Sequence, residues 1–303
     1  MNNIKYTYIV LLVFAFSLMS NAQQDPMFSQ YQYNPLSINP AYAGTKDNFV
    51  MTGITRMQWV GIKDSPKTQS FSIHSPVGKN MGLGFTAQND VAGPLHQMMF
   101  YTDYSYQIDI GFESRLSFGL KAGFHVVDLD LMDIESHQQN DPSIYNLKSY
   151  FLPNVGVGVY FYTYSFYMGV SAPRLLNQSL NPQIIGQSEL VRHFFFTTGY
   201  VFDLDDIVKV KPSLMVRYTP NAPVSFDVST HLYYDKIGFG VGYRSEDAVV
   251  GFFEFYLSRQ LAFGYSYDYT MSDLRHESNG SHELMFRYDF SKGGNVCREP
   301  KYF

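Results

Sequence analysis

The chain is poor in charge, in cysteine and in long apolar runs, and each shortage excludes a class of protein. Only 16% of its 303 residues are charged, against about a quarter in soluble domains. The single cysteine, Cys297, cannot form an internal disulfide, which excludes a disulfide scaffold. A formal net charge of −5 leaves no basic field for nucleic acid. A mean hydropathy of −0.17 excludes a polytopic helical membrane protein, but not a membrane β-barrel, whose strands are only half apolar.

The first residues predict an export signal. Lys5 precedes an apolar run over 8–19, which is shorter than the roughly 20 residues that a transmembrane helix needs. Ser20 and Ala22 stand at the −3 and −1 positions of a cleavage site, so we expect a signal peptide over 1–22 with cleavage after Ala22. An uncleaved anchor is the alternative. In either case the protein leaves the cytoplasm.

The rest of the chain is rich in aromatic residues that alternate with small or polar ones. Its 26 Phe, 25 Tyr and single Trp exclude a disordered chain. In 261–269, Leu, Phe and Tyr occupy every odd position, while Ala, Gly, Ser and Asp occupy the even ones. This is the pattern of a strand with two unlike faces. A soluble sandwich alternates as well, but glycine and serine on the non-apolar faces suit the crowded inner wall of a barrel. Aromatics at the ends of the apolar faces are typical of the girdles that meet lipid headgroups.

The alternation divides into about 14 segments, each near the length that a tilted strand needs to cross a bilayer. They are 49–60, 67–77, 80–90, 96–109, 115–127, 151–163, 164–172, 192–204, 207–218, 223–234, 236–244, 248–258, 260–270 and 281–290. The long connections, near 128–150, 173–191 and 271–280, all follow odd-numbered segments, and the connections after even-numbered segments are tight. Outer-membrane barrels sort their loops in this way, and a sandwich has no reason to do so. We therefore predict an all-β fold, a transmembrane antiparallel outer-membrane β-barrel of about 14 strands over 49–290, located in the cell outer membrane.

Two segments of the mature chain lie outside the predicted barrel. Residues 23–48 contain Asp25-Pro26, Asn34-Pro35 and Asn39-Pro40, and the residue before a proline is biased away from helix. We expect an extended, turn-rich N-terminal segment that is either periplasmic or a plug of the barrel. Residues 291–303 are expected to form a periplasmic C-terminal tail, because an even number of strands puts both ends on one side of the membrane.

The sequence offers no catalytic site and no cofactor site, so we expect a protein that is not an enzyme. The Gly-x-Gly pairs at 156–158 and 238–240 lie inside alternating strands, so neither is a phosphate loop. No Gly-x-Ser-x-Gly nucleophile elbow is present. The His-Glu pairs at 276–277 and 282–283 lack the helical His-Glu-x-x-His spacing of a zinc site. The acidic residues of 128–135 lack the glycine and the spacing of a calcium loop, and a solvated loop is the favoured interpretation.

A set of charged residues falls on the faces that would line the lumen. Its members carry both signs, and they are Lys121, Arg217, Asp227, Arg244, Glu254, Asp268, Glu283 and Arg287. One interpretation is a lining that selects solutes for passage. The other, which we favour, is a polar network that fills a narrow barrel, because mixed charges in a closed interior usually pair.

Several motifs resemble the PorP/SprF family of outer-membrane proteins, which is associated with type IX secretion and gliding motility. The most specific stretch is Asp25-Pro26-Met27-Phe28-Ser29-Gln30-Tyr31, followed by Asn34-Pro35 and Asn39-Pro40-Ala41-Tyr42-Ala43-Gly44. Weaker matches are Gln58-Trp59-Val60-Gly61, Gly82-Leu83-Gly84, Tyr104-Ser105-Tyr106, Gly169-Val170-Ser171-Ala172-Pro173, Tyr265-Ser266-Tyr267-Asp268-Tyr269 and Ser281-His282-Glu283-Leu284-Met285. Their order and spacing cover essentially the whole mature chain.

The resemblance implies a monomeric barrel without catalytic residues that works with the secretion machinery. Its implied partners are a secreted adhesin with a C-terminal sorting domain, periplasmic or lipoprotein components of that machinery, and outer-membrane lipids. Core machinery and a dedicated adhesin subgroup both stay open, and an outer-membrane channel or transporter for small solutes is the alternative. Tyr145 and Tyr150, in a long connection, are candidate interface anchors. The candidate partner or plug residues are Phe28, Tyr31, Asn34, Pro35, Asn39, Pro40, Tyr42 and Gly44.

Overall fold

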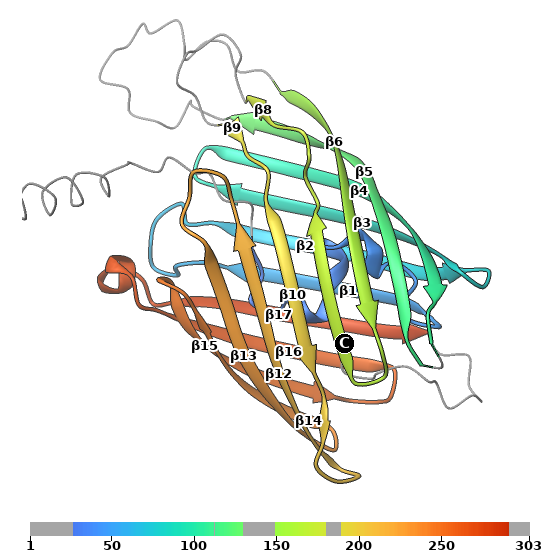
Figure 1. Cartoon of the computed structure of the whole chain (residues 1–303). Coiled ribbons are helices and arrows are strands. Elements are labelled where there is room, and N and C mark those ends of the chain that lie inside the picture. The colour runs from blue at the N-terminus through green and yellow to red at the C-terminus, as the bar shows by residue number, and fades with distance from the viewer. Residues whose placement is uncertain (1–26, 112, 130–148, 180–188, 291–303) are drawn as a thin grey trace, which may run out of the picture.

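The computed structural model describes residues 27–111, 113–129, 149–179 and 189–290. Fourteen strands form one closed antiparallel barrel (Figure 1). They are β1 (Phe49–Met57), β2 (Lys67–Val77), β3 (Met81–Ala92), β4 (Leu95–Asp109), β5 (Arg115–Leu129), β6 (Tyr150–Tyr162), β7 (Phe166–Ala172), β10 (Phe194–Tyr200), β12 (Val208–Tyr218), β13 (Ser225–Tyr234), β14 (Ile237–Arg244), β15 (Ala248–Tyr256), β16 (Leu261–Thr270) and β17 (Ser281–Phe290). Among the residues described, no helix is both long and apolar enough to cross a membrane.

Each barrel strand pairs with the strands next to it along the chain, so the topology is a simple up-and-down meander. The first strand, β1, pairs antiparallel with the last, β17, and this pairing closes the ring. Three further short strands are not members of the ring. The two-residue β11 (Phe202–Asp203) pairs with β12, and β8 (Gln178–Ser179) pairs with β9 (Glu189–Leu190).

The alternation in the sequence becomes an inner and an outer face of the barrel wall. Along β13, Asp227, Ser229 and His231 are buried, whereas Phe226 and Val228 are exposed. Successive side chains of a strand point to opposite faces, so polar residues line the interior and apolar residues form the surface that meets lipid. The expected fold class and strand number are therefore confirmed.

Most strand limits lie within three residues of the sequence prediction, and two differences are larger. The segment expected over 192–204 is divided at Val201 into β10 and β11, although the Val201 amide still donates to Ser165 O (2.7 Å) in line with the β7–β10 pairing. The β8–β9 hairpin lies within the connection expected over 173–191. Strands of two residues are too short to show a period, and the sequence therefore gave no sign of them.

The connections are sorted by length between the two ends of the barrel. The connections 130–149, 173–193 and 271–280 leave one end, which we call the long-connection end. The turns 78–80 and 235–236 are at the opposite, short-turn end, where β1 also begins.

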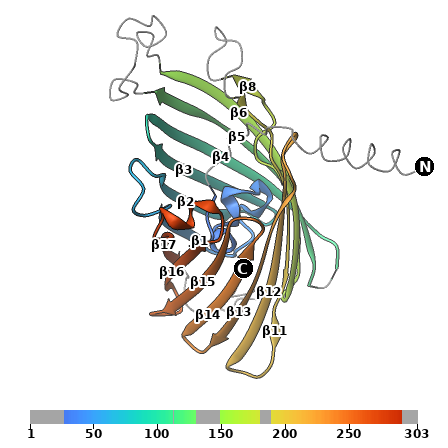
Figure 2. The ribbon, with the colours of Figure 1, turned by 90° about the vertical axis from the view of Figure 1, so that its left-hand side faces the viewer.

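Residues 27–48, which we call the inner segment, lie inside the barrel (Figure 2). The segment contains three short 3-10 turns, η1 (Tyr31–Tyr33), η2 (Pro35–Ser37) and η3 (Pro40–Tyr42), and proline is the first residue of the last two. Leu36 has an exposed fraction of 0%. The segment runs from the long-connection end towards the short-turn end, because Ser29 contacts the final part of β16 whereas Ala43 contacts the first part of β3.

Candidate functional site

The beginning of the inner segment is bound by carboxylates of the last two strands. The backbone amides of Ser29 and Gln30 donate to the two oxygens of Glu283 at 2.9 and 2.8 Å. The Ser29 hydroxyl donates to Asp268 Oδ2 at 2.7 Å. Glu283 has an exposed fraction of 0%, and a buried carboxylate requires such donors or a cation to offset its lost hydration.

Two arginines complete this cluster. Arg56, exposed by only 2%, contacts Asp268 at 2.8 Å and Glu283 at 3.2 Å. Arg244 contacts Asp227 at 3.3 Å and Asp268 at 3.4 Å. Both guanidinium groups also donate to the Ser29 hydroxyl at 3.0 Å. We call Arg56, Arg244, Asp268 and Glu283 the ion-pair cluster. All four are buried, so removing one member would leave its partners with a buried charge that has lost a counterion.

A second polar cluster holds Tyr33 in the half of the barrel near the short turns. The Tyr33 hydroxyl donates to Glu254 and also lies 3.1 Å from His231 Nδ1 and 3.1 Å from the Tyr233 hydroxyl. Lys211 Nζ lies 5.2 Å from the centre of the Tyr33 ring, within the range of a cation–π contact. Burial, followed by the nearby Glu254 carboxylate, raises the pKa of the Tyr33 phenol well above its usual value.

The later part of the inner segment is held mainly through its backbone. Ser105 donates to Ala43 O at 2.6 Å, Ser117 to Ala41 O at 2.7 Å, and Ser171 to Ile38 O at 2.8 Å. Three different strands therefore supply one hydroxyl each to carbonyls that the 3-10 turns leave without a strand partner. These bonds satisfy buried backbone groups that would otherwise lose their hydration.

Glycines in the wall make this close approach possible. A β-carbon placed on Gly119 would lie 2.1 Å from Ala41 N, and one on Gly158 would lie 2.0 Å from Asn39 Oδ1. A β-carbon on Gly82 would lie 2.2 Å from Ala43 O. No side chain fits at these distances. The small inward residues that the sequence showed are thus the surface against which the inner segment packs.

The structure places the eight sequence-predicted charges on the inner faces of their strands, but it does not bring them into one site. Asp227, Arg244, Asp268 and Glu283 meet at the beginning of the inner segment. Glu254 binds Tyr33, while Lys121 pairs with Asp103 at 3.2 Å and donates to Leu36 O at 3.2 Å. Arg287 pairs with Asp289, and Arg217 donates to Ser225 at the long-connection end.

The candidate partner or plug residues all lie in the inner segment. Most are buried, namely Phe28, Tyr31, Asn34, Asn39, Pro40, Tyr42 and Gly44, and Pro35 is half-buried. Asn39 accepts from the Ala41 amide at 3.0 Å and donates to Val159 O at 3.1 Å, so one side chain both caps η3 and joins it to β6. Asn34 accepts from the Ser72 hydroxyl at 2.8 Å.

Sequence reasoning missed Arg56, Asp103, Lys211 and His231, all of which take part in these clusters. Each lies on the inner face of a strand whose alternation is visible in the sequence. Their odd or even position along the strand would have predicted that these side chains face the lumen, but no local motif in the sequence indicates their partners. The expected signal peptide over 1–22, Tyr145 and the expected tail with Cys297 lie outside the described residues. Tyr150 is described and begins β6, where it packs beside Val127.

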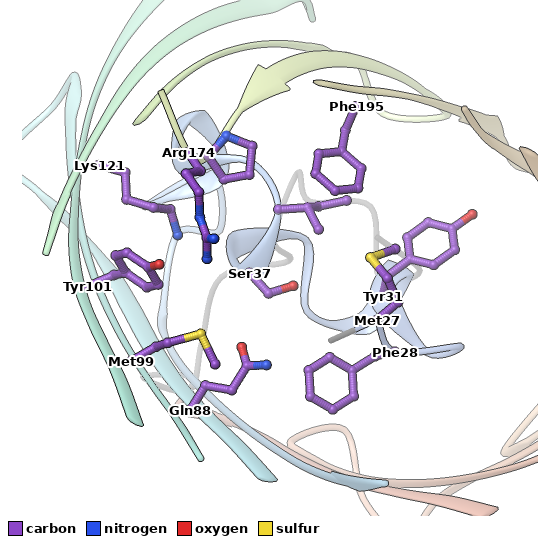
Figure 3. Close-up of a pocket in the computed structure, with 12 residues that line it drawn as sticks. Met27, Phe28, Tyr31, Ser37, Gln88, Met99, Tyr101, Lys121, Arg174 and Phe195 are labelled. Carbon is purple, nitrogen blue, oxygen red and sulfur yellow. The ribbon is translucent and has the colours of Figure 1, made fainter. Parts of the chain in front are cut away.

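A pocket remains between the inner segment and the wall (Figure 3). Its volume of about 50 Å³ is enough for only a few water molecules. Met27, Phe28 and Ile38 of the inner segment contribute to its lining, together with Lys121 and Phe195 of the wall. Within the described ranges, no group of three His, Cys, Asp or Glu side chains could hold a metal ion. In the described part of the chain, these side chains together bind a segment of the chain itself.

The profile of type IX secretion system membrane proteins, PorP/SprF, matches residues 20–288, which include the inner segment and nearly all of the barrel. The chain belongs to this family. It is thus an outer-membrane barrel of a secretion-system family, as the resemblance in the sequence implied. No curated protein sequence matches the chain.

Solved structures with a similar fold are outer-membrane barrels. The Acinetobacter baumannii outer membrane protein Omp33 is 9% identical, with 82% of this chain and 100% of that chain covered and a TM-score of 0.50. The CymD monoaromatic hydrocarbon channel is 11% identical, with coverage of 91% and 96% and a TM-score of 0.51. A Pseudomonas aeruginosa FadL homologue is 10% identical, with coverage of 88% and 95% and a TM-score of 0.50. At such identities these likenesses concern the fold alone.

Proposed function

We propose that this protein is a non-enzymatic component of type IX secretion that helps to export a large adhesin or to attach it at the cell surface. The adhesin carries a C-terminal sorting domain, and periplasmic or lipoprotein components of the machinery are the other partners. The observation that carries the proposal is the match of the PorP/SprF profile across the barrel. The occupied lumen supports a binding role over turnover or free diffusion.

The proposed topology follows from the two ends of the barrel. A signal peptide, removed after Ala22, delivers the chain to the outer membrane, where the long-connection end faces outward and the tail 291–303 faces the periplasm. Outer-membrane barrels have long external loops and short periplasmic turns, which supports this orientation. The secreted partner then meets the long-connection end.

In this proposal the inner segment is a plug. Its burial, its hydrogen bonds to Glu283 and its contacts with the wall glycines support a structural role inside the barrel over contact with a periplasmic partner. Deleting residues 25–44 tests both roles. A plug predicts poor assembly or a conducting barrel, and a partner contact predicts normal assembly with loss of machinery components on purification. Normal assembly, secretion and partner recovery would contradict both.

The main test is the surface and medium proteome of a strain that lacks this gene, compared with its parent and with a complemented strain. Loss or release of one large sorting-domain protein would assign the barrel to that adhesin. Loss of many sorting-domain proteins together would make it a core part of the machinery. An unchanged proteome would overturn the secretion role, and conductance in planar bilayers would then test the channel alternative.

A further inference from the structure

We propose that the wall around the first half of the inner segment, residues 27–33, is an exchangeable peptide-binding site, which a segment of another polypeptide enters from the long-connection end. Its ligand is a short peptide with an aromatic residue directly before a serine and a second aromatic residue two positions after it, as in Phe28-Ser29-Gln30-Tyr31. The proposed function makes the secreted partner the source of this peptide. Only the source rests on the proposed function, and the site itself does not.

The ion-pair cluster is complete without the inner segment, because its members come from β1, β14, β16 and β17 and pair with one another. Arg56 lies 2.8 Å from Asp268 and 3.2 Å from Glu283. Arg244 lies 3.4 Å from Asp268 and 3.3 Å from Asp227 of β13. Each charge of the cluster therefore keeps a counterion in the wall when the first half of the inner segment leaves. A site that is fixed in this way is preorganised, so little binding free energy is lost in ordering it.

The ion-pair cluster binds groups that many peptides carry. The two oxygens of Glu283 accept from the consecutive backbone amides of Ser29 and Gln30 at 2.9 and 2.8 Å, and every residue except proline supplies such an amide. The Ser29 hydroxyl donates to Asp268 at 2.7 Å and accepts from both arginines of the cluster at 3.0 Å. Recognition by the cluster therefore needs two free amides and one hydroxyl, and each of these hydrogen bonds is strengthened by a charged partner.

Two apolar clusters set the positions of the aromatic residues on either side of the serine. Phe28 packs in one cluster with Met285 of β17. Tyr31 packs in another with Phe195 of β10 and Met215 of β12. Phe28, Tyr31 and Phe195 all border the pocket between the inner segment and the wall (Figure 3). Methionine adapts its shape to different apolar groups, so each cluster accepts a large apolar side chain and rejects a charged one.

The first half of the inner segment is the part that can leave while the rest stays. Arg244 is the last residue of β14 and Glu283 is the third residue of β17, so the ion-pair cluster lies close to the long-connection end. Met27 is half-buried and borders the pocket. The second half contacts the wall glycines and continues directly into β1. Residues 27–33 therefore exchange towards the long-connection end while residues 34–48 stay in the lumen.

The test is a fluorescence anisotropy titration of the purified full chain in detergent. The probe is a labelled, acetylated and amidated heptapeptide with the sequence of residues 27–33. Wild type should bind it weakly, because the chain's own segment competes at a high effective concentration. Ser29→Ala removes from that segment the hydroxyl that three charged groups bind, and it leaves the wall unchanged. We expect this variant to bind the peptide at least about tenfold more tightly than wild type. Phe28→Ala weakens the segment through an apolar contact instead and should act in the same direction.

Hydrogen exchange of the chain shows whether the peptide replaces the segment. In Ser29→Ala with bound peptide, exchange should rise in 27–33 and stay slow in 34–46. The peptide with alanine in place of its serine is the matched ligand control, and it should bind at least about tenfold more weakly. Ser37→Ala is the control variant, because this hydroxyl donates to Asn34 O within the second half, and it should bind the peptide as wild type does.

Three outcomes would overturn the proposal. They are binding by Ser29→Ala and Phe28→Ala that is no tighter than binding by wild type, equal affinity for the serine and alanine peptides, and binding without faster exchange in 27–33. Peptides tiled across the sorting domain of the partner that the proteome comparison identifies test the source. Binding of one of them supports the secreted partner, and binding of the 27–33 peptide alone removes that partner as the source. An unchanged proteome would overturn the secretion role without changing the titration, so the two proposals fail separately.

Discussion

The two halves of the inner segment are held in the barrel by different means and by different strands. Residues 27–33 are bound mainly by charged and polar side chains of β1 and of β13–β17, including Arg56, Glu254 and Glu283. Residues 34–46 contact β2–β7, where serines bind their carbonyls and glycines admit their backbone. Charged and polar side chains therefore hold the first half in place, and close fit of its backbone to the wall holds the second half in place.

This difference predicts that each half can be released separately. Loss of a charge should act on the amides of Ser29 and Gln30, which donate to Glu283, and leave the glycine contacts in place. A side chain added at a wall glycine should instead disturb the glycine contacts of residues 34–46 and leave the amides of Ser29 and Gln30 bound to Glu283. Peptide-resolved hydrogen exchange distinguishes the two cases, because protected amides report local opening of each half.

The largest expected effect is that of Glu283→Ala. Removing this carboxylate leaves Arg56 buried with one acidic partner fewer, and breaking such a pair costs about 3–5 kcal/mol. Exchange should rise in 27–33 and stay slow in 34–46. Glu277→Ala, at an exposed position of the 271–280 connection, is the matched control. An equal rise in both halves would show that the segment is released as one unit.

Gly119→Ala tests the second half, which close fit to the wall holds in place. Its new β-carbon would lie 2.1 Å from Ala41 N, and overpacking of this kind costs about 1–3 kcal/mol. We expect faster exchange in 34–46 and a lower urea midpoint, followed by the fluorescence of the only tryptophan, Trp59. Gly53→Ala is the control, because nothing lies within 4 Å of the added carbon there. The same effect from both variants would mean that strand propensity, and not contact with Ala41, is responsible.

Tyr33→Phe tests the polar contacts next to the junction of the two halves. The variant loses the hydroxyl that donates to Glu254, at a cost of about 1–2 kcal/mol. The raised pKa of the phenol also sets a pH dependence. The folded protein binds the phenol proton more tightly than the unfolded chain does. The stabilisation of the folded state by the protonated Tyr33 hydroxyl is therefore complete below the usual pKa of 10.0, and it is lost as the pH rises above that value.

The measurement for this variant is unfolding in urea at neutral and at strongly alkaline pH. The difference in stability between wild type and Tyr33→Phe should narrow at alkaline pH. Tyr234→Phe, on the outer face, is the control, and the difference in stability between wild type and this variant should be the same at both pH values. A gap between wild type and Tyr33→Phe that widens at alkaline pH would contradict the assignment.

The smallest expected effect is that of Ser72→Ala, at the junction itself. Its hydroxyl donates to Asn34 Oδ1 at 2.8 Å, and a neutral hydrogen bond is worth about 1 kcal/mol. Because Asn34 is the first residue of the second half and follows Tyr33 directly, exchange should rise slightly in both halves. Ser75→Ala, whose hydroxyl bonds only to the adjacent Pro76 carbonyl among the bonds described, is the control. A change confined to one half would place the junction elsewhere in the segment.

The barrel could be predicted from the sequence, because lipid outside and polar groups inside impose a period of two on every long strand. That period is visible around Phe226 and Asp227, and also around Leu120 and Lys121. The partners of these charges could not be predicted. Arg56 and Asp268 are separated by most of the chain and meet only after the ring closes. A plug was one of two roles expected for residues 23–48, but nothing local showed that Ser29 would lie near the long-connection end.

The contact between Ser29 and the strands β1 and β17 has a consequence for the order of assembly. Arg56 and Glu283 belong to the two strands that close the ring, and each touches Ser29. Neither residue has all its partners until the first and last strands meet with the inner segment already between them. One of the last strands to leave the ribosome therefore completes the binding site for one of the earliest residues of the described chain. The set of contacts that holds Ser29 in the barrel is therefore complete only in the closed ring.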